Sequence, residues 1–117
     1  MRRKPGALVP LEVVILDVGL TLLNQGEDEF HGYQLAREMK QLAGDRFRTA
    51  YGTLYRALGR MEQAGLLGSR WEDPAVAETE GRPRRRLYRV TASGEAAFRE
   101  APKPERHRNL KPGGQPV

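Results

Sequence analysis

A chain of 117 residues has the size of one domain with a modest hydrophobic core. It contains no cysteine, which excludes disulfide bonds, a thiolate nucleophile and a zinc–thiolate site. The longest apolar stretch, residues 8–23, is interrupted by Glu12 and Asp17. Because it is too short and too polar for a membrane span, and no small-residue cleavage site follows it, we expect a cytoplasmic protein.

The net charge of +5 is modest, but the charges are segregated along the chain. Basic residues gather in three places: Arg2, Arg3 and Lys4; Arg82, Arg84, Arg85, Arg86 and Arg89; and Lys103, Arg106, Arg108 and Lys111. Acidic residues gather just before the second group: Glu72, Asp73, Glu78 and Glu80. A charged run often serves only to keep a loop solvated, whereas segregation of this kind favours a polyanionic partner.

The first predicted element follows a loose basic arm over residues 1–9. Pro10 suits the first turn of a helix, and this helix would run to about Leu23. Its β-branched residues would also suit a strand, and periodicity alone does not decide between the two.

The second predicted element is a helix from His31 to Ala43, reached through an acidic turn over residues 26–29. Its inward positions are Leu35, Ala36, Met39 and Leu42. Gly44 is its expected C-terminal stop, and residues 45–48 turn the chain into the next helix.

The third predicted element is a helix from Thr49 to Gly65 with two distinct faces. Apolar residues at helical spacing make a stripe for the core: Leu54, Ala57, Leu58, Met61 and Ala64. The opposite face holds small, hydroxyl-bearing or cationic residues: Thr49, Gly52, Thr53, Arg56 and Arg60. Because none of these is acidic, the face can enter a DNA major groove without repelling phosphate.

A two-stranded hairpin is predicted next, with strands at about 67–72 and 85–91 and a turn over residues 79–83 that Pro83 fixes. Thr91 or Ser93 would then cap a last helix, which Pro102 should stop near Ala101. Residues 102–117 are rich in proline, glycine and basic residues and have almost nothing to bury, so we expect a disordered tail. The domain would therefore span residues 10–101.

Four segments resemble the PadR family of bacterial transcriptional regulators in order and spacing: HGYQLAREM (31–39), TLYRALGRMEQAGLL (53–67), SRWE (69–72) and RPRRRLYRVTASGEAA (82–97). The resemblance as a whole extends over roughly Leu11 to Arg99. The resemblance implies a mainly α fold with a small β-hairpin, namely a winged helix-turn-helix with a short C-terminal helix. It also implies a nucleoid-associated repressor that binds an inverted-repeat operator in double-stranded DNA as a homodimer.

The expected interface with DNA combines residues of the third helix, the hairpin and the second helix. Thr49, Thr53 and Arg56 would meet base edges, and Arg84, Arg85 and Arg86 would reach the backbone or minor groove from the wing. Tyr33, Tyr55 and Arg60 would hold phosphate, and Tyr51 would flank the reading face as the more exposed of the helix's two tyrosines.

The family usually dimerises through a C-terminal helix packed on the partner's first helix. Here that helix has about ten residues, which leaves less surface for a dimer and for a small hydrophobic effector. The first helix would compensate, because its apolar residues exceed what one core plausibly covers. The predicted dimer contact is made by Leu11, Val14, Ile15, Val18, Leu22 and Phe98.

Other roles receive less support from the residues. His31 fits a helix start better than a metal ligand, because the only other histidine is His107, and we expect no metal and no cofactor. Trp71 fits packing on the hairpin better than a stacking plate for drugs. No catalytic motif occurs, so an enzyme is not expected. The alternative is a winged helix used as a protein-interaction module, for example a phage or plasmid antagonist of a host regulator.

Overall fold

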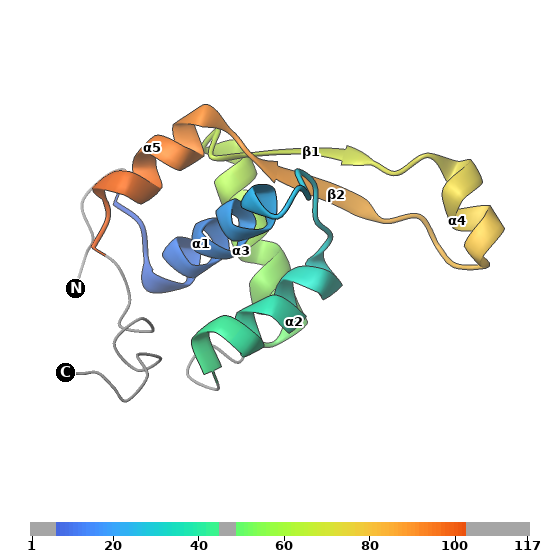
Figure 1. Cartoon of the computed structure of the whole chain (residues 1–117), viewed down its shortest axis with the longest axis horizontal. Coiled ribbons are helices and arrows are strands. Elements are labelled where there is room, and N and C mark those ends of the chain that lie inside the picture. Colours follow the sequence, from blue (N-terminus) through green and yellow to red (C-terminus); the bar gives the residue numbers. More distant parts are fainter. Residues whose placement is uncertain (1–6, 45–48, 103–117) are drawn as a thin grey trace.

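The computed structural model describes residues 7–44 and 49–102. The predictions for residues 1–6 of the N-terminal arm, for the turn at 45–48, and for His107 and the tail from residue 103 lie outside this part. Its elements are α1 (Pro10–Asn24), α2 (Gly32–Ala43), α3 (Tyr51–Gln63), β1 (Leu67–Trp71), α4 (Pro74–Glu80), β2 (Arg86–Val90) and α5 (Ala92–Glu100). Figure 1 shows α2, α3 and α5 gathered around α1 and the hairpin projecting to one side, with α4 at its tip. The predicted fold, mainly α with a small β-hairpin, is confirmed. No helix in the described part is long and apolar enough to cross a membrane.

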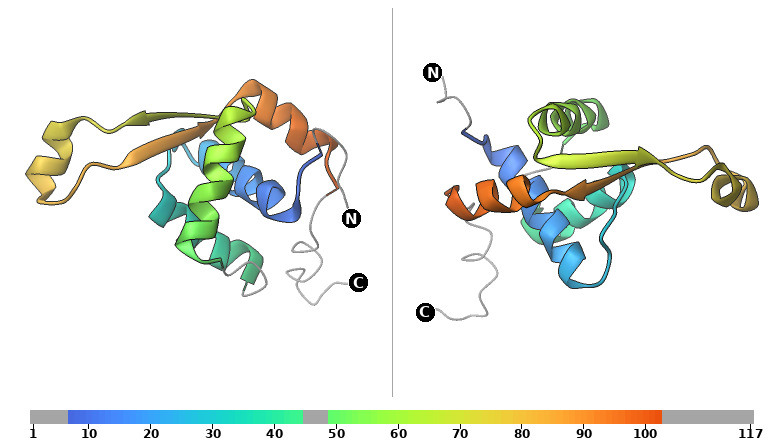
Figure 2. Two further views of the ribbon diagram at one scale, coloured as in Figure 1. Left: turned by 180° about the vertical axis from the view of Figure 1, so that it is seen from behind. Right: turned by 90° about the horizontal axis from the view of Figure 1, so that it is seen from above.

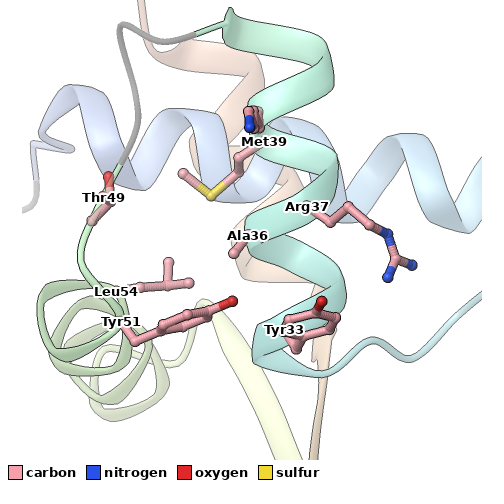
Figure 3. Close-up of a pocket in the computed structure, with 8 residues that line it drawn as sticks. Tyr33, Ala36, Arg37, Met39, Thr49, Tyr51 and Leu54 are labelled. Carbon is pink, nitrogen blue, oxygen red and sulfur yellow. The ribbon is translucent and has the colours of Figure 1, made fainter.

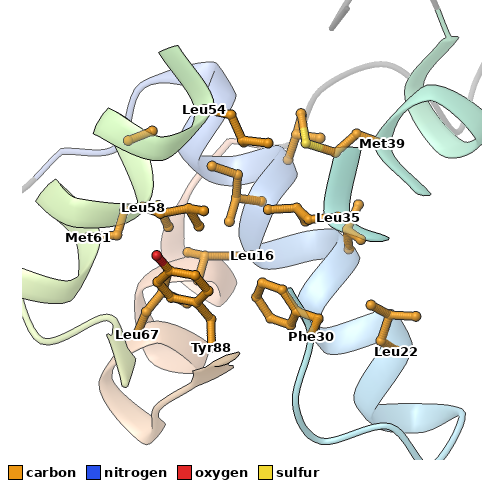
Figure 4. Packing of buried hydrophobic residues seen from close by; sticks show 14 residues of the cluster. Leu16, Leu22, Phe30, Leu35, Met39, Leu54, Leu58, Met61, Leu67 and Tyr88 are labelled. Carbon is orange, nitrogen blue, oxygen red and sulfur yellow. The ribbon is translucent and has the colours of Figure 1, made fainter. Parts of the chain in front are cut away.

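Helix α1 is the centre of the domain, in contact with α2, α3, α5 and β2. Pro10 occupies its first turn as predicted, and the side chain of Glu12 accepts a hydrogen bond from the Val9 amide at 3.0 Å, which caps the helix start. The helical alternative for this segment is therefore correct. Its apolar residues lie in the main cluster of buried side chains, together with Phe30, Leu35, Leu54 and Leu58 (Figure 4).

Helices α2 and α3 present the apolar stripes that their spacing predicts. In α2, Leu35 and Met39 are buried, while Ala36 and Leu42 pack partly buried against the same core. In α3 the buried residues are Leu54, Ala57, Leu58 and Met61. Ala64 is an exception, because α3 ends at Gln63 and Ala64 is its exposed C-cap. Thr49 likewise lies before the helix, since the N-cap is Ala50.

The hairpin is joined to the helical body by a short backbone pairing outside its two strands. Within the hairpin, β1 and β2 are antiparallel, with Trp71 opposite Arg86. Phe30, in the connection between α1 and α2, pairs with Tyr88 through two backbone hydrogen bonds of 2.8 and 2.9 Å. Both rings are buried and stack at 6.2 Å between centroids. The hairpin is therefore anchored on the same core that holds α2 and α3.

The tip of the hairpin differs from the prediction. Instead of a simple turn over residues 79–83, the chain forms α4 and then closes through Gly81, whose φ is +66°. Asp73 caps α4 by accepting from the Ala75 amide, and Pro74 occupies the first turn. This Asp-Pro start with a glycine after the last turn is a helix signal that is visible in the sequence. Figure 2 shows α4 at the far end of the hairpin, away from the body.

Of the two predicted caps for α5, Thr91 is the one that the structure uses. Its hydroxyl accepts from the Gly94 amide at 3.0 Å and donates to the Gly65 carbonyl at 2.7 Å. A Cβ at Gly94 would collide with the Leu66 carbonyl oxygen, so only glycine allows α5 to lie this close to the start of β1. The helix ends at Glu100, near the predicted position.

Candidate nucleic-acid interface

The outward face of α3 carries no acidic residue before Glu62, in the last turn of the helix. Thr53 and Arg56 are exposed, and the Arg56 guanidinium donates to the Thr53 hydroxyl at 3.3 Å. Such a pair offers a planar cation together with a hydroxyl group, both of which bind base edges in a major groove. Thr49 lies half-buried in the segment that leads into the helix, so it belongs to the edge of this face rather than to its centre.

A row of aromatic rings links α2 to α3 beside this face. His31, Tyr33, Tyr51 and Tyr55 follow one another with ring centroids 6.3–6.5 Å apart. The three tyrosines are about half exposed, although Tyr51 is only slightly more exposed than Tyr55. The Tyr55 ring lies against Gly32, where any Cβ would collide with it, so this glycine allows the row to form.

His31 occupies the start of α2 as predicted. Its Nδ1 accepts a hydrogen bond from the Gln34 amide at 3.2 Å, which requires an unprotonated nitrogen. Partial burial lowers the pKa of the His31 imidazole, and the positive charges of Arg85 and Arg37 lower it further. The neutral form of this cap is therefore favoured.

A hollow of about 300 Å³ opens between α2 and α3 at the middle of this row (Figure 3). Its lining consists of Tyr33, Ala36, Arg37, Met39, Lys40, Thr49, Tyr51 and Leu54. Arg37 and Lys40 are exposed cations on the face of α2 that bears Tyr33, and the Arg37 guanidinium lies 5.7 Å from the Tyr33 ring centroid. Sequence reasoning did not select either cation, although Arg37 lies four residues after Tyr33 and Lys40 three further on, a spacing that indicates one helix face.

The hairpin of β1 and β2 is the wing; residues 73–81 form its tip, and Glu72 with residues 82–86 forms its neck. Glu72 holds this neck together. Glu72 is almost fully buried and accepts two hydrogen bonds of 2.8 Å from the Arg82 guanidinium and one of 3.1 Å from the Arg85 amide. Arg82 also pairs with Glu80 at 2.8 Å. The hydrogen bonds from Arg82 hold the pKa of the Glu72 carboxyl at about 2, against the opposing effect of burial. Arg82 is therefore a structural residue of the wing and is not available as a free cation.

The three arginines predicted to reach DNA from the wing have different surroundings. Arg84 is exposed and its guanidinium lies 5.5 Å from the Trp71 ring centroid. Arg85 is half-buried, and its positive charge contributes to lowering the pKa of His31 at the start of α2. Arg86 is held toward α3, because it pairs with Glu62 at 3.6 Å. The three arginines are consecutive in the sequence, but in the structure each lies beside different neighbours.

Arg60, predicted to hold phosphate, has a partner inside the protein. Its guanidinium donates from Nε and Nη2 to the nearly buried carboxylate of Glu12, both at 3.3 Å. This contact joins α3 to the start of α1. About half of the Arg60 side chain remains exposed in spite of this contact.

The predicted dimer contact assumed that α1 carries more apolar side chains than the core of one chain can cover. The structure contradicts this assumption. Four of the predicted residues are fully buried within the single chain, at 0–3 % exposure: Val14, Ile15, Val18 and Leu22. They form the core with α2 and α3 and cannot face a partner as well. Leu11 and Phe98 are only partly buried. Beside Phe98, a groove of about 320 Å³ runs between α1 and α5, and its α1 side includes Leu20 and the 45 % exposed Leu23.

A three-helix body, a helix with an acid-free outer face and a hairpin with a basic neck together define a winged helix-turn-helix protein. Comparison with known proteins agrees with this class. Residues 20–100 match the model of the transcriptional regulator PadR-like family. Over 84 residues the chain is 40 % identical to the transcriptional regulator Rv3488 of Mycobacterium tuberculosis, and the match covers 71 % of this chain and 70 % of that protein.

Solved structures share the fold. A PadR family transcriptional regulator from Eggerthella lenta is 30 % identical, with a TM-score of 0.50 over 75 % of this chain and 66 % of that one. Bacillus subtilis PadR in complex with operator DNA is 20 % identical, with a TM-score of 0.57 over 92 % of this chain and 49 % of that one. The protein belongs to the PadR-like family of transcriptional regulators.

The Glu72 carboxyl supplies a test of the wing neck. Its pKa in the folded protein is depressed, so its contribution to stability is complete above the ordinary value of 4.5 and is lost as the pH falls toward about 2. We expect a carboxyl ¹³C titration to place the Glu72 midpoint near pH 2 and Arg82→Gln to move it up toward 4.5. An ordinary midpoint in the unmodified protein would contradict the Glu72–Arg82 contact.

Proposed function

We propose that this protein is a DNA-binding repressor that recognises an inverted-repeat operator as a homodimer. The observation that carries the proposal is the outer face of α3, which carries no acid before Glu62 and is flanked by half-exposed tyrosines and by cations of α2 and the wing neck. The Bacillus subtilis relative, which shares the fold over most of this chain, is in complex with operator DNA. A repressor would act by occupying the promoter and excluding the polymerase.

In this proposal, α3 lies in the major groove with Thr53 and Arg56 toward the base edges and Thr49 at the rim. The guanidinium of Arg56 would contact guanine, the commonest specific partner of arginine. Tyr33, Tyr51 and Tyr55, with Arg37 and Lys40 beside them, would meet the phosphates on one side of the groove and set the register. The half-exposed side chain of Arg60 would meet a phosphate on the far side, while Glu12 accepts hydrogen bonds from its Nε and Nη2.

The first test concerns Arg56. Replacing it by alanine should weaken operator binding by about 1–3 kcal/mol and relax preference at one base position. The matched control is Arg70→Ala on β1, whose guanidinium pairs with Glu29 at 2.7 Å and lies outside both the α3 face and the groove between α1 and α5, so it should not affect binding. Gel mobility shifts on the promoter of the protein's own gene, with competitor DNA, measure both. A promoter fragment that gives no discrete complex with the unmodified protein would favour the protein-interaction module instead.

The wing would touch DNA only with its neck. Arg84 and Arg85 would contact the backbone or the minor groove, and Arg86 would contribute less because Glu62 partly neutralises it. The tip, by contrast, exposes Asp73, Glu78 and Glu80, and phosphate repels these acids. We infer that α4 stands away from the DNA.

Replacing Arg84, Arg85 and Arg86 together by glutamine should weaken specific and random DNA about equally. The slope of log affinity against log salt should become shallower by about 0.9 for each phosphate that the variant no longer neutralises, because fewer counterions are released. Glu78→Gln, on the same hairpin but at its tip, should leave the slope unchanged. Fluorescence anisotropy at several salt concentrations measures these slopes, and an unchanged slope in the triple variant would place the wing off the DNA.

The dimer would form through the groove between α1 and α5, where Leu20, Leu23 and Phe98 would meet the same residues of a second copy. Two recognition helices could then enter successive major grooves about 34 Å apart on an inverted repeat. Because this surface is small, we expect weaker dimerisation than in relatives with a longer C-terminal helix. A small hydrophobic effector, if one acts on this protein, remains a prediction from the family resemblance.

Sedimentation tests this surface with two variants that each place a charge on an exposed apolar residue. Leu23→Glu should shift the protein toward monomer, since it places the charge in the groove. Val76→Glu at the wing tip, where the exposure is similar at 42 %, should leave the association unchanged. A strict monomer at high micromolar concentration in the unmodified protein would refute the dimer, and equal effects of the two variants would refute this groove as its site.

A further inference from the structure

The only tryptophan of the chain, Trp71, lies on the wing with 54 % of its surface exposed. It therefore contributes little to the core. Two guanidinium groups lie close to its ring instead, Arg86 at 5.2 Å and Arg84 at 5.5 Å from the centroid. Both distances fall within the range in which a cation is attracted to an indole. Tryptophan is the side chain that binds cations most strongly in this way.

The two arginines are held at their other contacts as well. Arg86 is opposite Trp71 in the hairpin and pairs with Glu62 of α3, which also accepts a hydrogen bond of 2.5 Å from Ser69 of β1. The Nε of Arg84 donates to the Glu72 carbonyl at 3.2 Å. These contacts form a continuous line from α3 to the neck of the wing. We call this line the wing stack; it consists of Glu62, Arg86, Trp71 and Arg84.

Within the wing stack, Arg84 has a geometry suited to a phosphate. One side of its guanidinium is fixed by the Glu72 carbonyl and by the Trp71 ring. Its Nη atoms have no hydrogen-bond partner in the described part of the chain, and the side chain is exposed. A planar fork held in this way loses less conformational freedom when it binds a phosphate than a free side chain would.

We propose that Trp71 is a positioning residue for DNA binding, which acts by holding Arg84 ready for a backbone phosphate. This inference rests on the proposed function, because it assigns a role to Trp71 within the DNA interface. It also gives the exposed indole of Trp71 a role other than packing. Trp71 need not touch DNA, since its effect passes through Arg84.

A double-mutant cycle separates this role from a merely structural one. Trp71→Ala should weaken binding to a random-sequence duplex by about two- to twelvefold, which corresponds to the cost of immobilising one long side chain. In an Arg84→Gln background the same change should have no further effect. In an Arg70→Gln background it should have its full effect, because Arg70 lies next to Trp71 in β1 but pairs with Glu29.

Trp71→Phe is the second variant, because it keeps an aromatic face and the bulk of the hairpin. It should restore most of the affinity that alanine loses. In the free protein, the Arg84 Nε–H resonance should lose its ring-current shift in Trp71→Ala and keep part of it in Trp71→Phe. An equal loss of affinity in the Arg84→Gln background, or full affinity in Trp71→Ala, would overturn the inference. Failure of the proposed function is distinguishable, because then the unmodified protein would not bind the duplex.

Discussion

The pairing of Phe30 with Tyr88 sets the position of the wing relative to the helices that face the proposed DNA surface. Its two backbone hydrogen bonds join the connection before α2 to the middle of β2, and the two rings are buried against α1 and α3. A hairpin of two short strands is marginal alone and needs such support. Because of this anchor, the contacts of Glu62 with Ser69 and Arg86 can form, and α3, α2 and the wing neck present one surface.

Charge on the wing is divided by the fold into two zones. At the neck, the buried Glu72 binds Arg82 and the Arg85 amide, so the acid organises the turn rather than opposing DNA. Beyond it, α4 extends the hairpin and carries the remaining acids away from the body. The wing therefore differs from a simple basic loop: its basic part is short, close to α3 and conformationally fixed. Such a surface favours a defined docking angle over general attraction to any polyanion.

The central helix shows how a correct residue pattern can support a wrong inference. The apolar residues of α1 suggested a surface left over for a partner. In the structure, α2, α3, α5 and β2 cover it from several sides, so most of its circumference belongs to the core of the single chain. A helix at the centre of a small domain is apolar almost all round for this reason. The surface left for a partner is the shallower groove between α1 and α5.

The features that could be predicted from the sequence are those that depend on neighbours along the chain. Helices α2, α3 and α5, the start of α2 at His31, the core stripe of α3 and the two strands follow from spacing and from contacts within a few residues. Which arginines stay available for a ligand could not be predicted in this way. Arg60, Arg82 and Arg86 resemble Arg56 and Arg84 in the sequence, yet each meets a carboxylate: Glu12, Glu72 and Glu62. Two of these carboxylates come from another element and the third from ten residues earlier, across the wing tip. An ion pair depends on distance in space, and only the packed fold sets that distance.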